Sequence, residues 1–128
     1  MKTYRIAAIP GDGIGNEVIP AGIEVLKHLA DRFRLEFETF DWSSKRYLGT
    51  GAYIPDGGLG ELKKFDAIFF GAVGAPEVPD HISLWGLRLP ICQGFDQYAN
   101  VRPSRLLPGI EGPVKNAKEI DWVIVREN

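Results

Sequence analysis

"YRIAAIPGDGIGNEV", residues 4–18, is the stretch that decides the fold class of this chain. Residues 4–9 form a mainly apolar run that stops at Pro10-Gly11, which predicts a short, largely buried strand. Beyond the glycines, apolar residues recur at helical spacing from Val18 to Phe33, with charged residues between them, and predict an amphipathic helix. A strand that passes through a glycine turn directly into a helix is typical of α/β proteins.

The chain that follows repeats this alternation of strand and helix. A half-exposed strand is predicted at residues 35–40, where apolar and charged side chains begin to alternate, and a buried strand at residues 66–73. Helices are predicted at residues 59–64 and 83–98, the second kinked or delayed by Pro90. We therefore predict an α/β fold with mainly parallel strands and right-handed crossovers.

The composition is that of a soluble globular protein. Hydrophobic residues make up 45% of the 128 residues and charged residues 25%, with a net charge of -2, which argues against a disordered or nucleic-acid-binding chain. No apolar run approaches the ~20 residues of a membrane span, and the N-terminus leads into a strand rather than a signal peptide. A cytoplasmic protein without nucleic-acid or membrane partners is expected. The single cysteine, Cys92, excludes an intrachain disulfide and a multi-cysteine metal site.

The glycine turn "PGDGIGNE", residues 10–17, connects the first predicted strand to the first predicted helix. Such a turn can bring backbone N–H groups to a phosphate, but the spacing here does not fit the usual fingerprints. The third glycine is Gly15, and Asn16 occupies the position where G-x-G-x-x-G needs glycine. Asp12 would also repel a pyrophosphate. The pattern alone favours a structural turn with Asn16 as the helix N-cap, and it leaves a cofactor-binding role open.

Four blocks in the same order resemble one known family. They are "IPGDGIGNEVIPAGIEVL", "FDAIFFGAVGAP", "FDQYANVRPSRLLPGI" and "VIVREN". Together they are similar to the N-terminal part of the β-decarboxylating dehydrogenases, the family of isocitrate and isopropylmalate dehydrogenases. The segment "VPDHISLWGL" and the closing strand resemble most closely the tartrate and D-malate branch of that family.

The resemblance implies a specific fold and a cofactor site. The expected fold is an isopropylmalate-dehydrogenase-like mixed sheet flanked by helices, which is not a standard Rossmann fold. In this family the glycine turn lies beside the nicotinamide end of NAD and does not cradle phosphates, which agrees with the spacing above. The residues that the resemblance places at the cofactor are Ile14, Gly74, Ala75, Pro76 and Trp85.

Arginines are the candidate substrate ligands. A 2-hydroxy diacid presents two carboxylates, and a guanidinium holds a carboxylate through two parallel, charge-assisted hydrogen bonds. Arg102 precedes a proline that favours an extended backbone, and Arg126 follows a four-residue apolar run, residues 122–125, that predicts a buried strand. Taken singly, each could be an ordinary surface ion pair. The resemblance assigns both to a set of three arginines that clamps the substrate.

Two positions depart from the family pattern. The first of the three family arginines falls at Cys92, and we hypothesise that Arg88, one helical turn earlier, supplies the guanidinium instead. The alternative for Cys92 is a small buried apolar residue. Trp85 stands where isopropylmalate-specific relatives use small aliphatic side chains, so it would shrink the pocket and favour a short diacid. The alternative is a tryptophan that packs in the core.

Oxidation of a 2-hydroxy acid also requires a hydride acceptor, a base and a cation that polarises the developing carbonyl. The resemblance places the catalytic tyrosine and lysine and the aspartates that bind Mg²⁺ or Mn²⁺ beyond residue 128. No catalytic or metal-binding residue is therefore expected in these 128 residues. The aspartates present are interpreted as turn or surface residues: Asp12, Asp31, Asp41, Asp56, Asp66, Asp80, Asp96 and Asp121.

The expected domain organisation follows from the resemblance. Residues 1–98 are expected to be the first segment of the cofactor-binding domain, and residues 99–128 the truncated start of a second domain that binds substrate and forms a homodimer. The chain is thus expected to be an N-terminal fragment, inactive alone, of an enzyme that uses NAD and Mg²⁺ or Mn²⁺ to oxidise tartrate or D-malate, with or without decarboxylation. Two alternatives stay open: an isopropylmalate dehydrogenase, and a stand-alone, non-catalytic α/β module that binds a nucleotide or a partner chain.

Overall fold

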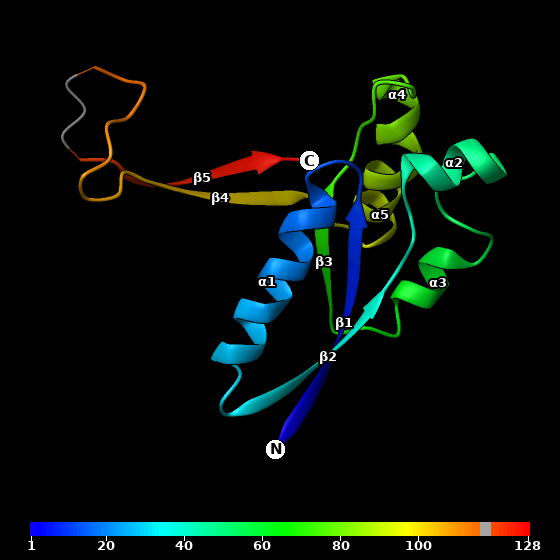
Figure 1. Ribbon diagram of the computed structural model, residues 1–128, viewed down its shortest axis with the longest axis horizontal. Helices are drawn as coiled ribbons and strands as arrows, with labels where there is room; N and C mark the ends of the chain where they lie inside the picture. The colour runs from blue at the N-terminus through cyan, green and yellow to red at the C-terminus, as the bar shows by residue number, and fades with distance from the viewer. Residues whose placement is uncertain (116–118) are drawn as a thin grey trace. The chain divides into compact units, whose positions relative to one another are not determined.

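A computed structural model describes residues 1–115 and 119–128 of the chain. These residues form two compact units, Met1–Ile91 and Cys92–Asn128, which we describe separately. The boundary between the units lies before the domain boundary that the sequence predicts after residue 98. Figure 1 labels the helices and strands along the chain.

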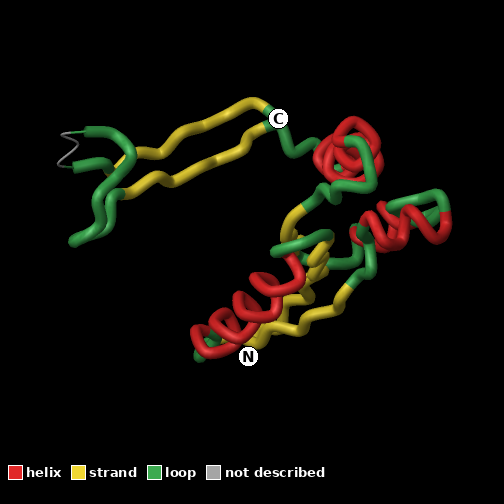
Figure 2. Tube along the Cα trace, turned by 45° about the horizontal axis from the view of Figure 1, so that its top comes forward, coloured by secondary structure: helices red, strands yellow, loops and turns green. Residues whose placement is uncertain are grey.

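The first unit contains a parallel sheet with strand order β2-β1-β3. β1 (Lys2–Gly11) is the central strand and pairs with β2 (Phe33–Thr39) and β3 (Ala67–Ala72). The helix α1 (Gly15–Leu29) runs along one face of this sheet, as Figure 2 shows. The sequence therefore predicted the strands and the parallel pairing correctly, and the α/β fold class is confirmed; the first helix is confirmed except at its end, because Phe33, expected on the helix, begins β2.

Small residues allow α1 to lie close to the sheet. Ala7, Ala8 and Ile9 of β1 are fully buried. In the middle of α1, a Cβ on Gly22 would lie 2.7 Å from the Phe69 ring. Glycine costs about 1 kcal/mol in a helix relative to alanine, so the close approach of Phe69 explains why glycine is found there.

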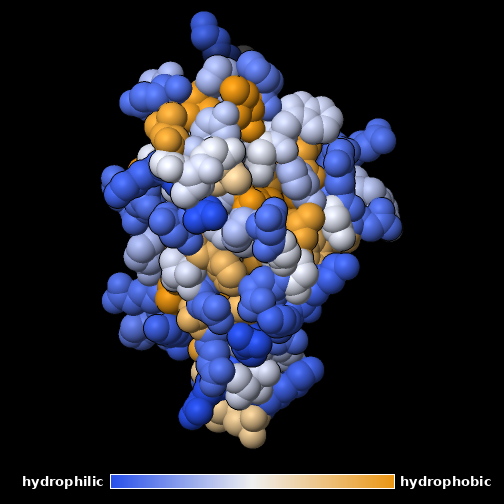
Figure 3. All heavy atoms as spheres, turned by 90° about the vertical axis from the view of Figure 1, so that its right-hand side faces the viewer, coloured by the Kyte–Doolittle hydropathy of each residue, from blue (hydrophilic) through white to orange (hydrophobic). Residues whose placement is uncertain are grey.

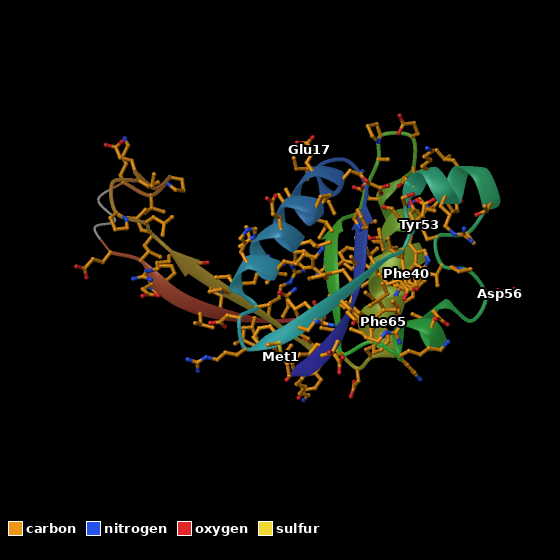
Figure 4. All side chains as sticks on the ribbon, turned by 60° about the horizontal axis from the view of Figure 1, so that its bottom comes forward. Met1, Glu17, Phe40, Tyr53, Asp56 and Phe65 are labelled. Atoms are coloured by element: carbon orange, nitrogen blue, oxygen red, sulfur yellow. The ribbon has the colours of Figure 1, made fainter. Side chains whose placement is uncertain are left out.

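Aromatic side chains form a second cluster in this unit. The Phe40 ring contacts Trp42 at 5.1 Å and Phe65 at 5.4 Å between ring centroids, both in edge-to-face geometry. Figure 4 shows Phe40 and Phe65 side by side. Such pairs stabilise a fold by about 1 kcal/mol each beyond the area they bury. On the outer face over α2 and α3, hydrophilic side chains surround small apolar patches (Figure 3).

Two features of the helices differ from the prediction. The predicted N-cap of α1 was wrong: the N-cap is Ile14, with no side-chain capping bond, and the Asn16 amide donates to the Gly13 carbonyl oxygen at 3.3 Å. The helix α2 (Ser44–Thr50) was not predicted. Its signals were present, because the Ser43 hydroxyl caps the helix start and Gly51 adopts φ 81° after its end.

The helical stretch after β3 is longer at its start and shorter at its end than predicted. The short α3 (Gly58–Leu62) precedes β3. After β3, α4 (Asp80–Ser83), the π-helix η1 (Leu84–Arg88) and α5 (Leu89–Gly94) follow one another directly. The Leu89 N–H donates to the Leu84 carbonyl, five residues back, so the helix widens just before Pro90. Proline would clash with the carbonyl four residues earlier in an ideal helix, which accounts for a distortion at this point.

The second unit contains an antiparallel ribbon of β4 (Ala99–Arg105) and β5 (Asp121–Glu127). Val101 pairs with Val125, and an ion pair of 3.7 Å joins Arg105 to Asp121. The prediction of a strand at residues 122–125 is confirmed, but the prediction that it is buried was wrong. All seven residues of β5 are exposed.

Candidate functional site

The glycine turn lies tightly against the end of β3. Gly11 adopts φ 71°, and a Cβ there would overlap the carbonyl oxygen of Ala72. The same oxygen accepts a hydrogen bond from the Asp12 N–H at 2.8 Å. A Cβ on Gly15 would overlap the carbonyl oxygen of Pro10. Glycine is therefore required at these two positions by close backbone packing.

Asp12 is not the turn or surface residue that the sequence predicted. Its side chain is only 7% exposed. One carboxylate oxygen accepts the Ser44 N–H at 2.7 Å, and the other accepts the Ser44 hydroxyl at 2.6 Å and the Gly74 N–H at 2.9 Å. A buried carboxylate is tolerated when donors saturate it in this way. The prediction failed because the partners of Asp12 lie far away in the chain.

The glycine turn, the start of α2 and the loop after β3 surround one open hollow. Its lining includes Gly13, Ser44, Lys45, Ala75 and Glu77. The structure thus brings Ala75, a predicted cofactor residue, to the glycine turn. No atom lies within 4 Å of a Cβ placed on Gly13, so bare backbone faces open space there.

The remaining predicted cofactor residues lie near these segments in the chain. Ile14 is exposed at the N-cap of α1. Gly74 is bound to Asp12, and Pro76 is exposed two residues further on. Trp85 belongs to η1 and is 62% exposed, so it is not a core residue in the described part of the chain.

In the second unit, Arg102 and Arg126 share one face of the ribbon. Arg126 is paired with Asn100, and Arg102 lies two residues along the same strand from Asn100. Residues paired across a ribbon, and residues two apart along a strand, project from the same face, and such diagonal neighbours are roughly 7–8 Å apart. Among the described residues, neither arginine forms an ion pair with a carboxylate. The interpretation of each as an ordinary surface ion pair therefore does not hold here.

Two asparagines that the sequence analysis did not consider lie beside these arginines. Asn100 Oδ1 accepts a hydrogen bond from Arg102 Nε at 3.1 Å, and Asn100 Nδ2 donates to Asn128 Oδ1 at 3.1 Å. Asn128 Nδ2 donates in turn to the Gln97 carbonyl at 2.7 Å. The alternation in "NVR", residues 100–102, could have indicated that Asn100 and Arg102 share a face.

The third predicted arginine and its neighbour belong to the helical stretch. Arg88 is the half-buried last residue of η1, in the first unit, and Cys92 is half-buried in α5. Arg88 as the third substrate-binding arginine stays a prediction. Within residues 1–115 and 119–128, no group of three metal-ligating side chains occurs. None of the helices in this part of the chain has the length and apolar character of a membrane-crossing helix.

Comparison with known proteins gives a consistent picture. Residues 5–128 match the isocitrate/isopropylmalate dehydrogenase family. The whole chain is 65% identical to a probable tartrate dehydrogenase/decarboxylase of Agrobacterium vitis and 54% identical to the D-malate dehydrogenase (decarboxylating) of Escherichia coli K12. In both cases it spans 37% of the relative's length.

Solved structures of the same family resemble this chain in fold. A β-decarboxylating dehydrogenase from Thermococcus kodakarensis matches with a TM-score of 0.66 and 35% identity, over 98% of this chain and 34% of that one. An isocitrate dehydrogenase from Methylococcus capsulatus matches with a TM-score of 0.74 and 25% identity, also over 98% and 34%.

Proposed function

Because this chain belongs to the isocitrate/isopropylmalate dehydrogenase family, we propose that the complete enzyme oxidises a short 2-hydroxy diacid, tartrate or D-malate, with NAD. The observation that carries the proposal is the pair of arginines, Arg102 and Arg126, on one face of the ribbon without carboxylate partners among the described residues. Two guanidinium groups at this spacing suit a small dianion, since each can hold a carboxylate through two charge-assisted hydrogen bonds. Asn100 supports the site by holding Nε of Arg102.

The hollow beside the glycine turn fits the nicotinamide end of NAD better than its phosphates. Among the described residues, Asp12, Asp41 and Glu77 line it against a single cation, Lys45, so its net negative charge disfavours a pyrophosphate and suits the cationic nicotinamide ring and ribose hydroxyls. Bare backbone at Gly13 leaves room for a flat group. When bound, NAD supplies the hydride acceptor, while Ile14, Ala75 and the neighbouring loop residues would hold and orient the ring.

The proposed divalent cation has no fitting ligand set in the described part of the chain. We assign Mg²⁺ or Mn²⁺, like the general base, to the rest of the complete enzyme, and derive no step through the metal from these residues. For the complete enzyme we propose that Trp85 favours a short substrate, because an indole in the substrate pocket would leave little room for a branched diacid. The relatives named above act on tartrate and D-malate by their names, which also favours these substrates over isopropylmalate.

A substrate panel tests the proposal. The complete enzyme, assayed with Mn²⁺ and NAD, is expected to produce NADH with D-malate or tartrate at a higher kcat/KM than with isopropylmalate. The same panel with NADP tests the choice of cofactor. Preference for isopropylmalate would favour that alternative enzyme. Nucleotide binding without oxidation of any diacid would favour a non-catalytic module.

We also propose that residues 1–98 are the first segment of a cofactor domain that other parts of a cytoplasmic, homodimeric enzyme complete. The support is a second apolar stripe on α1, at helical spacing and facing away from the sheet. It consists of Ile14, Val18, Val25 and Leu29, which are all exposed in the described residues. A helix that is apolar on two sides is normally covered on both.

Val25→Lys tests whether this stripe is covered in the complete enzyme. Val25 is 58% exposed here, so the substitution would be nearly neutral if nothing packed on it. If the stripe is covered, the free energy of unfolding should fall by about 2 kcal/mol or more, since a buried valine is lost and a charge enters its place. Thermal unfolding measures the change. Glu24→Lys introduces the same side chain on the polar side of α1 and should change stability by less than about 0.5 kcal/mol. Equal effects of the two substitutions would contradict the covering.

A further inference from the structure

A buried chain of three polar side chains crosses the first unit. The Ser44 hydroxyl lies 2.6 Å from the Asp12 carboxylate and 2.7 Å from the Tyr53 hydroxyl. Ser44 and Tyr53 are each only 2% exposed. Burial raises the pKa of Tyr53, and the Asp12 carboxylate and Tyr47 raise this pKa further, whereas its hydrogen bond with Ser44 lowers it. Tyr53 therefore stays a neutral phenol at physiological pH.

Backbone donors determine the direction of each hydrogen bond between Asp12, Ser44 and Tyr53. The two oxygens of Asp12 face the N–H groups of Ser44 and Gly74, and a backbone N–H can only donate. The side chain at position 12 must therefore accept on both oxygens. The Ser44 hydroxyl then donates to Asp12, which leaves the Tyr53 hydroxyl to donate to Ser44.

This chain of bonds joins the segments that carry the predicted cofactor residues. Asp12 belongs to the glycine turn beside Ile14, and Gly74 opens the loop that contains Ala75 and Pro76. At the other end, the Tyr53 ring packs against η1, where a Cβ on Gly86 would lie 2.5 Å from Cδ2 of the ring. Figure 4 shows Tyr53 in the interior of the unit.

The Tyr53 ring is itself held in place. It stacks on Tyr47 of α2 with 5.0 Å between ring centroids and 15° between planes. η1, which carries Trp85 and Arg88, is thereby connected through Tyr53 and Ser44 to Asp12. A π-helix in this place is notable because such turns occur frequently at functional sites.

We propose that Asp12 is a positioning residue for the nicotinamide end of the cofactor. It does so by holding the loop at residues 74–76 against the glycine turn and, through Ser44 and Tyr53, by linking this loop to η1. The proposal rests on the proposed function, because it assumes that these loops hold NAD. Asp12 itself need not touch the cofactor, since its two oxygens are occupied by protein donors.

The test is Asp12→Asn in the complete enzyme. The substitution keeps the shape but turns one acceptor oxygen into a donor NH₂. The Ser44 hydroxyl can rotate to accept from it, but a backbone N–H cannot, so either Gly74 or Ser44 loses its partner. We expect KM for NAD to rise by roughly tenfold, while KM for the diacid changes by less than about twofold.

Tyr53→Phe is the matched variant. It removes one hydroxyl of the same chain of bonds but leaves both backbone bonds of Asp12 intact. We expect KM for NAD to rise by less than about threefold in this variant. Amide hydrogen exchange of the ligand-free enzyme should be faster at Gly74 and Ala75 in Asp12→Asn than in Tyr53→Phe, with β1 unchanged in both.

Each outcome of these measurements either supports or overturns the role proposed for Asp12. A lower melting temperature in Asp12→Asn with an unchanged KM for NAD would mean that Asp12 is only structural, and equal KM changes in both variants would also overturn the proposal. If the unsubstituted enzyme neither binds nor uses NAD, the proposed function fails together with the cofactor part of this inference. Faster amide exchange at Gly74 and Ala75 would in that case still show, separately, that Asp12 holds the loop.

Discussion

Arg126→Ala in the complete enzyme is expected to lower kcat/KM for D-malate or tartrate by about two to three orders of magnitude. The side chain of Arg126 makes no hydrogen bond or ion pair within the described residues, so its guanidinium is available for a ligand. Removal would leave one substrate carboxylate without its charge-assisted partner. Steady-state kinetics with the preferred diacid measure the loss. Arg126→Lys should recover only part of it, because an ammonium cannot form the two parallel bonds of a guanidinium.

Arg105→Ala is the matched control for this prediction. Arg105 belongs to the same ribbon but to its other face, and it is an exposed residue paired with Asp121 at 3.7 Å. Exposed ion pairs contribute little, so kcat/KM should change by less than about twofold. Equal losses in the Arg105 and Arg126 variants, or no loss in the latter, would remove the case for a diacid site on the face that carries Arg102 and Arg126.

Gly11→Ala is expected to prevent folding or to lower the free energy of unfolding by more than about 4 kcal/mol. The added Cβ would overlap the carbonyl oxygen of Ala72, which closes the pairing between the ends of β1 and β3. Neither strand can move away without breaking the hydrogen bond from the Asp12 N–H to the same oxygen. Circular dichroism and thermal unfolding of the purified variant measure the effect.

Gly13→Ala separates backbone strain from this overlap. Gly13 also has a positive φ, 49°, but no atom lies within 4 Å of a Cβ placed on it. Alanine there should cost only about 1–2 kcal/mol, the penalty for a left-handed conformation. If both glycine variants were equally stable, the tight contact between the glycine turn and β3 would be refuted.

The regular elements could be predicted where a local pattern encodes them. β1 and β3 follow from short apolar runs bounded by turn residues, β2 from the alternation of apolar and charged residues, and α1 from its helical periodicity. α2 was missed because its seven residues carry no strong apolar period, and only Ser43 and Gly51 mark its ends. The fold class, by contrast, depends on the order of elements, which is visible without coordinates.

Of the residues at the candidate site, only those marked by a local sequence pattern were predicted. Arg102 and Arg126 were identified from their sequence blocks, but Asn100 was overlooked although it stands two residues from Arg102. Asp12 was interpreted as a surface residue because its three donors come from Ser44 and Gly74, which are 32 and 62 positions away. A charged side chain is normally expected to be exposed, and Asp12 can be buried only because these donors bind its carboxylate.

By itself, the sequence determined the alternation of strands and helices and the family, and it singled out the two arginines that we propose for a diacid, since each depends on local spacing or on contiguous blocks. Only the tertiary structure decided that Arg102 and Arg126 share a face, because the register of β4 and β5 sets which side chains project together. It also decided that Asp12 is buried among donors. Both results depend on which distant segments meet, and the pairing of distant segments is a property of the folded chain.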